Sequence, residues 1–316
     1  MIDSFINNKS AKRYYFQKDQ QNKSKMTYLK YIIFVLIISF TVNAQQDPHF
    51  SMYRYNMNVI TPAYAGTNGS LETTFAVRSQ WAGVENGPET LNFNVNSPIG
   101  ENIGLGLTVV NDKVFVLEET HLYADFSYKI KIAEEINLYT GIKAGGSFLK
   151  INLNELGIID DPLFTENINT FNPNVGVGFY LKAKKYYVSL SAPGLLSNDR
   201  YEKEGLNPVS AKDDTQIFLG GGYDFDLSEN FKLRPSILGK VVNGAPFSLD
   251  LTTSALYKER IELGANYRID ESVTMFFTAG FADNLFKVGY AYEYTTTNIN
   301  TYANGTHEII IKLKLN

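Results

Sequence analysis

The sequence predicts an all-β fold, a transmembrane up-and-down antiparallel β-barrel of about 14 strands. From residue 70 to the end, segments of about eight to twelve residues alternate apolar with polar or small side chains, which is the period of a β-strand. Gly, Asn, Asp and Pro separate these segments, as turn residues separate strands. The 21 Tyr and 21 Phe against a single Trp also favour strands and turns over helices.

The first 44 residues have the features of a secretory signal peptide. The apolar run YIIFVLIISF, residues 31–40, is about half as long as the ~20 residues of a spanning helix. Three lysines precede this run, and the small residues of a cleavage site end at Ala44. We therefore expect a signal peptide over residues 1–44, with Met26 as a more ordinary start than Met1. A short membrane anchor is the alternative.

The balance of charges argues against nucleic-acid binding. The whole chain has 29 Lys and Arg against 33 Asp and Glu, a formal net charge of −4. Residues 1–44 hold seven of the basic and two of the acidic residues, so the chain from residue 45 has 22 basic and 31 acidic residues and a net charge of −9. Nucleic-acid-binding proteins rely on basic patches instead. The absence of cysteine excludes disulfides, thiol nucleophiles and thiolate metal sites.

Residues 45–69, QQDPHFSMYRYNMNVITPAYAGTNG, form an irregular segment before the first strand. The segment has neither helical nor strand periodicity, yet it is rich in aromatic and asparagine residues that need shelter and hydrogen-bond partners. We expect it to fold into or across the periplasmic mouth of the barrel as a plug. Lumen side chains such as Arg78 or Lys312 would satisfy its backbone groups. A docking strip for other periplasmic components is the alternative.

Residues 70–316 are expected to form the barrel itself. In the stretch ETLNFNVNSP, Leu91, Phe93 and Val95 share one face, and three asparagines share the other. Short connectors such as AKK, residues 183–185, alternate with longer ones such as NDKVFVLEE, residues 111–119. This alternation predicts hairpins with short turns at one rim and long loops at the other. The predicted strands cover residues 70–80, 89–97, 102–111, 120–130, 136–151, 172–183, 186–192, 214–224, 231–240, 247–257, 261–268, 273–281, 285–294 and 306–315.

Two architectures accept this pattern, a soluble sandwich or barrel and an outer-membrane barrel. In the membrane barrel the apolar positions face lipid and the polar positions face the lumen. The predicted strands have about the ~9–11 residues that cross a bilayer at a tilt, and the polar positions are rich in charge. The charged residues at these positions include Arg78, Asp125, Lys143, Lys182, Asp250, Glu262 and Arg268. These features favour the membrane barrel and leave open whether its lumen is a water channel or is filled.

No catalytic or metal-binding pattern is present in the sequence. The three histidines, His49, His121 and His307, lack metal-ligand spacing, and no serine motif accompanies His121 as a hydrolase would require. The acidic pairs Asp160-Asp161 and Asp213-Asp214 lie in or beside long loops. Solvation of these pairs is favoured over calcium binding. We expect no catalytic residue, no cofactor and no resident metal.

Four sequence blocks between residues 46 and 114 carry a family resemblance. They are QDPHFSMYRYNMNVITPAYAG, RSQW, NGPETLNFNVNSPI and GLGLTVVNDKV, in this order. Together they resemble the PorP/SprF family, which consists of outer-membrane proteins of the type IX secretion system in Bacteroidetes. The family motif falls on Asp47, Pro48, Phe50, Ser51, Tyr53, Asn56, Pro62, Ala63, Tyr64, Ala65, Gly66, Arg78, Gln80, Trp81, Gly87 and Pro88. Met57, Thr61 and Glu89 depart from the residues common at their positions.

The resemblance implies a non-enzymatic outer-membrane protein that supports protein secretion. Members of the family accompany large surface proteins, including gliding adhesins, and are thought to hold their C-terminal domains at the cell surface. The implied partners are such a C-terminal domain, other type IX secretion components and outer-membrane lipid. Which adhesin is bound, and whether motility is served, stays open.

Two long loops are the expected place for contacts with a partner, because exposed loops carry variable recognition surfaces. The loops cover residues 152–171 and 193–213. Their apolar candidates are Phe164, Ile168, Phe171, Leu195, Leu196 and Tyr201, the kind of anchors that interfaces use. The alternative is that both loops only cap the barrel.

Two further functions are open at the level of sequence. The first is an outer-membrane channel for small or hydrophobic solutes, which would conduct ions in planar bilayers. The second is an outer-membrane hydrolase, which would lose its activity when His121 is replaced.

Overall fold

The computed structural model describes residues 50–156, 167–197, 199–203, 209–212 and 214–315. The predicted signal peptide and the motif residues Asp47 and Pro48 lie outside these ranges. Within the ranges, no helix is both long enough and apolar enough to cross a membrane.

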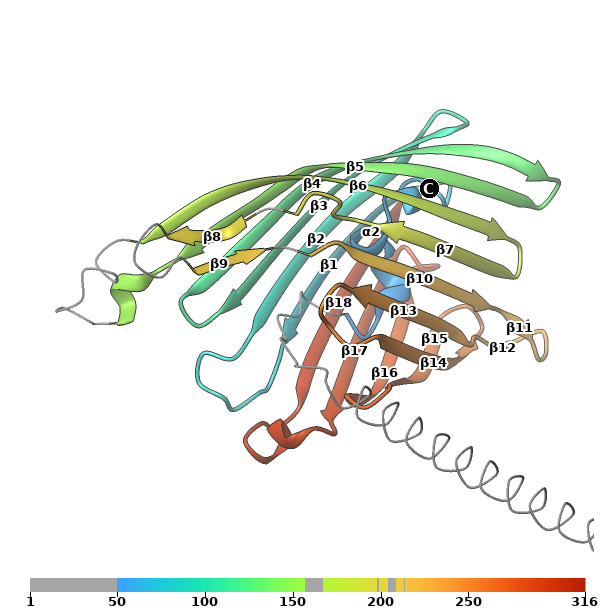
Figure 1. The fold of residues 1–316 in the computed structure, drawn as a ribbon. Coiled ribbons are helices and arrows are strands. Elements are labelled where there is room, and N and C mark those ends of the chain that lie inside the picture. Colours follow the sequence, from blue (N-terminus) through green and yellow to red (C-terminus); the bar gives the residue numbers. More distant parts are fainter. Residues whose placement is uncertain (1–49, 157–166, 198, 204–208, 213, 316) are drawn as a thin grey trace, which may run out of the picture. The chain divides into compact units, whose positions relative to one another are not determined.

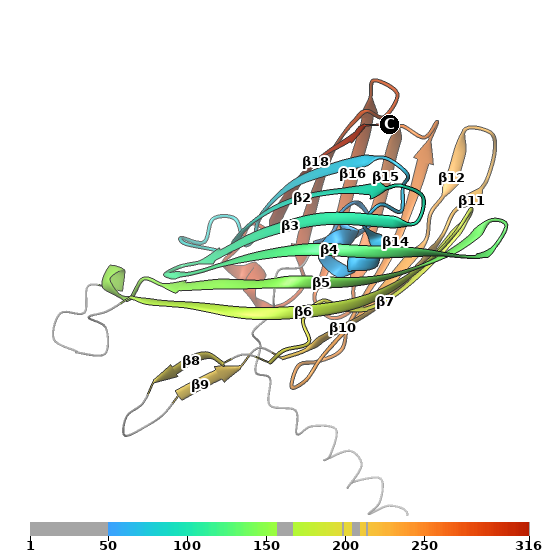
Figure 2. The same ribbon diagram turned by 90° about the horizontal axis from the view of Figure 1, so that it is seen from above.

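The described chain forms a closed antiparallel β-barrel (Figures 1 and 2). Consecutive strands are neighbours almost throughout, and the pairings of β1 with β18 and of β14 with β15 complete the ring. The strands are β1 (Leu71–Ser79), β2 (Glu89–Ile99), β3 (Ile103–Val114), β4 (Leu117–Ala133), β5 (Ile136–Ile151), β6 (Ile168–Ala183), β7 (Tyr186–Ala192), β10 (Gln216–Tyr223), β11 (Phe225–Asp226), β12 (Phe231–Leu233), β13 (Ser236–Val242), β14 (Ser248–Tyr257), β15 (Ile261–Arg268), β16 (Ser272–Phe281), β17 (Phe286–Thr295) and β18 (Thr306–Leu315).

The barrel has fourteen spanning strands, as the sequence predicted. The sheet order contains sixteen strands, but β11 follows β10 after one residue, and β12 precedes β13 by two. Strands β12 and β13 both pair with β14, so they are two parts of one strand. An even number of spanning strands places the start of β1 and the end of β18 at the same rim, where Leu71 pairs with Leu315.

The two rims differ in their connections. At the first, which we call the short-turn rim, connections such as the one between β6 and β7 have two residues. At the second, the long-loop rim, the connections after β5 and β7 are the longest. One expectation was wrong here: β3 and β4 extend through most of residues 111–119, so only Phe115 and Val116 remain as a turn. The reason is that β3 and β4 form twelve residue pairs, and these pairs include most of the polar residues that were expected to form a loop.

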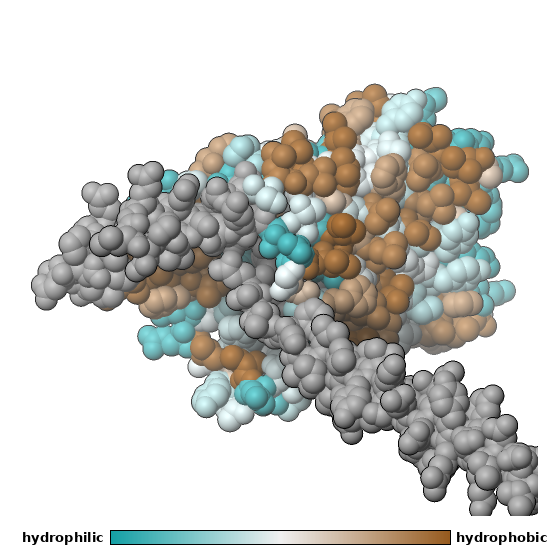
Figure 3. Space-filling model, in the orientation of Figure 1, coloured by the Kyte–Doolittle hydropathy of each residue, from teal (hydrophilic) through white to brown (hydrophobic). Residues whose placement is uncertain are grey.

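The strands present a polar face to the interior and an apolar face to the outside, which confirms the membrane-barrel arrangement. In β1 the alternation is strict, with Thr74, Ala76 and Arg78 buried and Phe75 exposed on the other face. Apolar side chains gather over the strands on the face seen in Figure 3. A sheet with exposed apolar positions on its outer face suits lipid contact, because lipid tails solvate such side chains. All seven charged residues predicted for the inner face are buried or half-buried.

A short irregular segment, residues 50–69, lies inside the barrel (Figures 1 and 2). It contains the single turns η1 (Tyr53–Tyr55), α2 (Met57–Ile60) and η2 (Pro62–Tyr64). The sequence did not indicate these turns, because a helix of three or four residues leaves no measurable period. Pro62 at the first position of η2 fits its fixed φ and missing N–H.

Smaller elements of secondary structure lie in the connections of the long-loop rim. They are η3 (Leu153–Leu156), η5 (Asn298–Thr301) and a separate hairpin of β8 (Asp199–Lys203) with β9 (Val209–Lys212). The hairpin lies within the predicted partner loop of residues 193–213.

Candidate functional site

The interior segment, residues 50–69, is packed against opposite parts of the barrel wall. One apolar cluster joins Tyr53, Met57 and Tyr64 of the segment to Tyr180 and Tyr187 of the wall. A second cluster joins Phe50 and Met52 to the residues Ala76, Phe276, Ala291 and Ile310 of the wall. The barrel wall therefore supplies the apolar contacts that shelter the aromatic side chains of the segment, and a long helix or strand is not needed for this.

A buried charge cluster holds the first residues of the segment. Nη2 of Arg78 lies 3.0 Å from Glu293, and Nη1 lies 3.4 Å from Glu308. The backbone N–H groups of Ser51 and Met52 donate to Glu308 at 2.8 and 3.3 Å, and the Ser51 hydroxyl donates to Glu293 at 2.7 Å. Two buried carboxylates require such pairing, because an uncompensated buried charge is costly. The cluster therefore fixes the segment in the half of the lumen nearer the long-loop rim.

Asparagine side chains hold the middle of the segment. Asn94 and Asn96, neighbours on the inner face of β2, donate to Asn56 and Asn58 at 2.6 and 3.0 Å. Lys143 of β5 donates to the Asn58 carbonyl at 3.0 Å and lies 3.5 Å from Asp125. The polar face that the sequence predicted for ETLNFNVNSP thus has a specific role, which is to satisfy amides of the interior segment.

The end of the segment reaches the short-turn rim through a close backbone approach. The hydroxyl of Ser127 donates to the Ala65 carbonyl at 2.6 Å, and the Gly66 N–H donates to Asn96 at 3.0 Å. A Cβ placed on Gly104 would collide with the Ala65 carbonyl, and one on Gly141 would collide with the backbone of Ala63. Glycine is therefore required at two wall positions, because the segment lies directly on them.

Three tyrosines of the segment have polar hydrogen-bond partners, two of them on the barrel wall and one within the segment. The Tyr53 hydroxyl donates to Ser236 at 2.9 Å, and the Tyr55 hydroxyl donates to Glu262. The Tyr64 hydroxyl accepts from Asn68 at 2.7 Å. Burial raises the pKa of all three phenols above the usual range, so they stay neutral and keep their hydrogen bonds.

The segment runs through the lumen rather than across its mouth alone. Ser51 contacts Arg78 and Glu308 in the half nearer the long-loop rim, whereas Thr67 and Asn68 accept from Lys182 near the short-turn rim. The partners of its backbone also differ from those expected. Arg78 contacts the Ser51 side chain rather than its backbone, and Lys312 pairs with Glu72 at 3.0 Å.

The remaining motif residues shape the first hairpin loop at the long-loop rim. The N–H of Gln80 donates to the Pro88 carbonyl at 2.8 Å, and the Gly87 N–H donates to Val84. Trp81 has a φ of 57°, and its N–H donates to Thr306 at 3.3 Å. These residues therefore set the turn between β1 and β2 and attach it to the start of β18.

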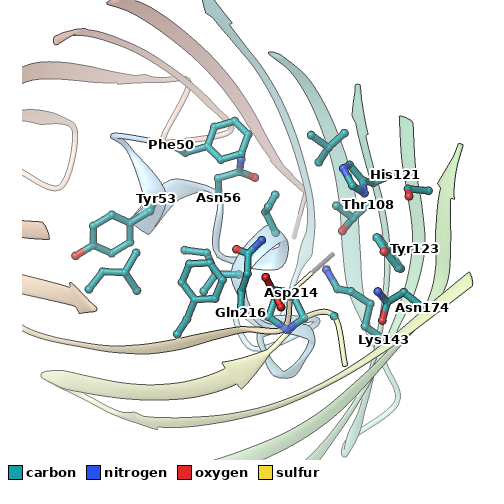
Figure 4. Close-up of a pocket in the computed structure, with 18 of the residues that line it drawn as sticks. Phe50, Tyr53, Asn56, Thr108, His121, Tyr123, Lys143, Asn174, Asp214 and Gln216 are labelled. Atoms are coloured by element: carbon teal, nitrogen blue, oxygen red, sulfur yellow. The ribbon is translucent and has the colours of Figure 1, made fainter. Parts of the chain in front are cut away.

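A chamber opens between the interior segment and the long-loop rim (Figure 4), and we call it the long-loop chamber. It has a volume of about 150 Å³. Phe50, Tyr53 and Asn56 of the segment form one side, and Thr108, His121, Tyr123 and Lys143 of the wall form the other, in Figure 4. Pro193, Gly194 and Leu196 also line it. The lining combines aromatic and aliphatic groups with a few polar ones, as is typical of binding sites.

A second chamber, the short-turn chamber, lies at the opposite end of the segment. It has a volume of about 420 Å³ and is lined by Arg54, Tyr55, Met57, Tyr64 and Asn68 of the segment together with residues of the short-turn rim. No described residue lines both chambers. The segment therefore lies between them.

The predicted partner-contact residues fall in different places. Leu196 lines the long-loop chamber, whereas Leu195, also exposed, does not. Ile168 and Phe171 belong to β6 rather than to a loop, and Phe171 is on the outer face, in contact with Phe148. Phe164 and the side chain of Tyr201 lie outside the described residues.

Some of the histidines and acidic residues considered in the sequence lie in the described part of the chain. No three His, Asp or Glu side chains there are grouped as metal ligands would be. His121 lies 3.8 Å from Glu119, and His307 shares a hydrogen bond with Tyr290. Asp214 is exposed, and Asp160, Asp161, Asp213 and His49 lie outside the described ranges.

The sequence did not single out several residues that hold the segment, above all Glu293, Glu308 and Ser236. All three occupy inner-face positions of alternating strands. The signal that could have found the two glutamates is a carboxylate at a position whose neighbours on the same face are small or uncharged, since a buried charge there needs a partner.

Several solved structures are similar to this chain at low sequence identity. Omp33 of Acinetobacter baumannii has 9% identity and a TM-score of 0.45, with 78% of this chain and 98% of that chain covered. The CymD monoaromatic hydrocarbon channel has 10% identity and a TM-score of 0.48, covering 86% and 94%. A Pseudomonas aeruginosa FadL homologue has 10% identity and a TM-score of 0.45, covering 78% and 88%. Among curated proteins no match is found.

The family model of the type IX secretion system membrane protein PorP/SprF matches residues 42–313, which is most of the chain. The match extends from the interior segment through all fourteen spanning strands, and it agrees with the apolar outer face of an outer-membrane protein. This chain belongs to the PorP/SprF family of type IX secretion system membrane proteins.

Proposed function

We propose that this protein binds the C-terminal domain of a secreted surface protein or gliding adhesin at the long-loop chamber, and so supports its secretion and anchoring. The role is non-enzymatic. The observation that carries the proposal is the form of the chamber: it opens toward the rim that faces the cell exterior in barrels of this class, and the interior segment lies beneath it.

The chamber has the chemistry of a protein-binding site. Phe50, Tyr53 and Phe218 offer apolar contact, and aromatic residues dominate the energy of protein interfaces. Gln216 and Asn174 offer amide groups at the edge. A protruding side chain of a partner would bury apolar area there while its backbone meets polar groups at the rim.

We further infer that the interior segment acts as a plug. Its buried hydrogen bonds and ion pairs hold it between two chambers that share no lining residue. A barrel closed by a plug does not pass ions, so we expect the protein to give no conductance in planar bilayers. The alternative function, a channel for small or hydrophobic solutes, requires conductance or uptake by the protein with the segment in place.

The test of partner binding uses the two neighbouring leucines of the loop. Leu196→Ala removes a chamber-lining side chain, whereas Leu195→Ala removes an exposed one of equal size beside it. Surface retention of the secreted protein is measured on intact cells by antibody labelling. We expect reduced retention for Leu196→Ala and unchanged retention for Leu195→Ala.

Replacement of residues 194–213 by a short Gly-Ser linker is the stronger version of the same test. Heat-dependent gel mobility shows whether the barrel has assembled. Unchanged retention in an assembled barrel with this loop removed would rule the loop out as the partner-binding element.

A further inference from the structure

The short-turn chamber is strongly basic in a chain with a net negative charge. Three acidic residues line it, Glu72, Asp224 and Glu259. The basic residues that line it are Arg54, Lys182, Lys184, Lys185, Arg234, Lys287, Lys312 and Lys314. Such an excess of one sign in a concave wall with tyrosine surfaces concentrates positive potential there.

Part of this charge is already balanced by carboxylates. Arg54 and Arg234 both contact Asp224, at 3.0 and 3.2 Å, and Lys312 contacts Glu72 at 3.0 Å. At the edge of the chamber, Lys184 and Lys185 pair with acidic residues of the neighbouring turns. These pairs organise the chamber but leave other cations in it.

Three lysines form no direct ion pair with a carboxylate among the described residues, although Glu72 attracts Lys182 and Glu262 attracts Lys287 from farther away. Lys182 donates only to Thr67 and Asn68 of the interior segment. Lys287 lies over the ring of Tyr55, 5.2 Å from its centre. Lys314 has no side-chain partner in the described ranges. All three are half-buried, so water screens their charge less than it would on an open surface.

The placement of these lysines indicates the shape of the ligand. Lys287 and Lys314 are on the adjacent strands β17 and β18, whereas Lys182 is on β6, which is separated from β18 by five strands of the wall. The side chain of Lys182 nevertheless lies near enough to Lys312 and Lys314 for their charges to repel, so the amines converge on one region of the chamber. A peptide chain with several carboxylates can balance several such amines, and its backbone can meet Asn68 and Asn284 at the same mouth.

The direction of the side chains indicates its source. Lys287 and Lys314 occupy positions of the inner face, in line with the buried Glu293 and Glu308 of the same strands. Lipid lies against the outer face, so a lipid headgroup would have to enter the lumen to reach them. The short-turn rim faces the periplasm in barrels of this class, where a soluble protein has direct access.

We propose that the short-turn chamber binds an acidic peptide segment of a periplasmic protein. The site is separate from the long-loop chamber, and the proposal does not depend on the binding of a secreted partner there. Charge-assisted contacts of carboxylates with Lys182, Lys287 and Lys314 would supply the affinity.

The experiment uses the full-length protein in nanodiscs of neutral lipid and a fluorescent peptide of alternating Glu and Gly residues. We expect saturable binding that weakens as salt is raised, and no binding of the matching Gln-Gly peptide. The variant Lys287→Gln with Lys314→Gln should weaken binding by about tenfold, because two of the three free cations are lost. Inorganic triphosphate should compete only weakly.

The matched control replaces two exposed lysines at the same rim that do not line the chamber, Lys131→Gln with Lys258→Gln. It changes the net charge by the same amount, and binding should stay within about twofold of the parent protein. Equal loss in both variants would overturn the proposal in favour of nonspecific charge attraction. Absence of peptide binding to the parent protein at low salt would also overturn it, as would saturable binding of short-chain phosphatidylglycerol that excludes the peptide.

Discussion

Two parts of the lining of the long-loop chamber are held in opposite ways: the interior segment, which we call the fixed wall, and residues 193–196, which we call the adaptable wall. On one side the interior segment is fixed by buried ion pairs and hydrogen bonds, from Ser51 on Glu308 to Ala65 on Ser127. On the other side residues 193–196 are held through exposed contacts, chiefly three hydrogen bonds of about 3.0 Å between Asn174 and the backbone of Leu195 and Leu196. One wall thus belongs to the core of the barrel, and the other can adapt.

This difference indicates that one chamber can combine a fixed role, closure of the lumen, with a variable role, recognition of a partner. Buried polar networks specify one arrangement and are costly to disturb. Exposed loop contacts contribute little to stability and open easily. We therefore expect changes on the segment side to alter stability and closure, and changes on the loop side to alter partner binding alone.

Removal of the central cation should have the largest effect on stability. Arg78→Ala leaves Glu293 and Glu308 buried without their shared partner, and breaking a buried ion pair from one side costs about 3–5 kcal/mol. The free energy of unfolding is measured by denaturant titration in lipid vesicles.

Arg78→Lys is the control for this change. It keeps the charge but not the two-pronged geometry, so its loss should be smaller. A loss for Arg78→Ala of less than about 1 kcal/mol would show that the charge cluster does not hold the segment.

Displacement of the segment should open the barrel. Gly141→Ala and Gly104→Ala place a methyl group against the backbone of Ala63 and Ala65, so the segment must move while the strands keep their pairing. We expect conductance in planar bilayers for both variants and none for the parent protein.

Gly221→Ala is the matched control for displacement. Its new methyl group would meet only the Tyr187 carbonyl, at 3.3 Å, and residue 221 shares the outer face of β10 with Leu219. Gly221→Ala should therefore not conduct. If Gly141→Ala and Gly104→Ala also fail to conduct although each barrel is assembled, closure of the lumen by the segment is contradicted.

A single hydrogen bond on the fixed wall should have a moderate effect. Tyr53→Phe removes the bond to Ser236 and should lower the free energy of unfolding by about 1 kcal/mol. Tyr128→Phe, on the exposed outer face, is the comparison and should change it by less than about 0.5 kcal/mol. Equal effects of the two changes would mean that the Tyr53 hydroxyl contributes nothing specific.

The smallest effect on stability is expected on the adaptable wall. Asn174→Ala removes the contacts to Leu195 and Leu196 and should change the free energy of unfolding by less than about 0.5 kcal/mol. It should nevertheless speed proteolysis of the loop on intact cells. Asn300→Ala, in the loop between β17 and β18, removes an exposed bond to Tyr294 and should leave this cleavage unchanged. Unchanged cleavage with Asn174→Ala would show that the loop is held by other contacts.

The outer framework of this protein could be predicted from the sequence because strand periodicity is local. Phe75 and Phe93 face outward because each lies one residue from a polar inner position, and that relation is visible in any short stretch. The strand ends were less predictable, as β3 and β4 show: pairing between strands continued through residues that look like a loop.

The candidate site was predictable only in part. The motif residues Phe50, Ser51 and Tyr53 were identified by resemblance, and Leu196 by its place in a long loop. Glu308 was not identified, because its uncharged neighbours on the same face indicate only that the carboxylate needs a partner, and not that this partner is the backbone of Ser51 and Met52.

By itself, the sequence determined a fourteen-stranded barrel with a polar interior, since side-chain alternation and turn residues act within a few positions. The tertiary structure alone decided what fills that interior. Arg78 meets Glu293 and Glu308 across 215 and 230 residues of chain, and Gly141 is needed because Ala63 lies on it. Contacts of this kind exist only after the barrel has closed, because closure brings the two ends of the chain to the same side of the lumen.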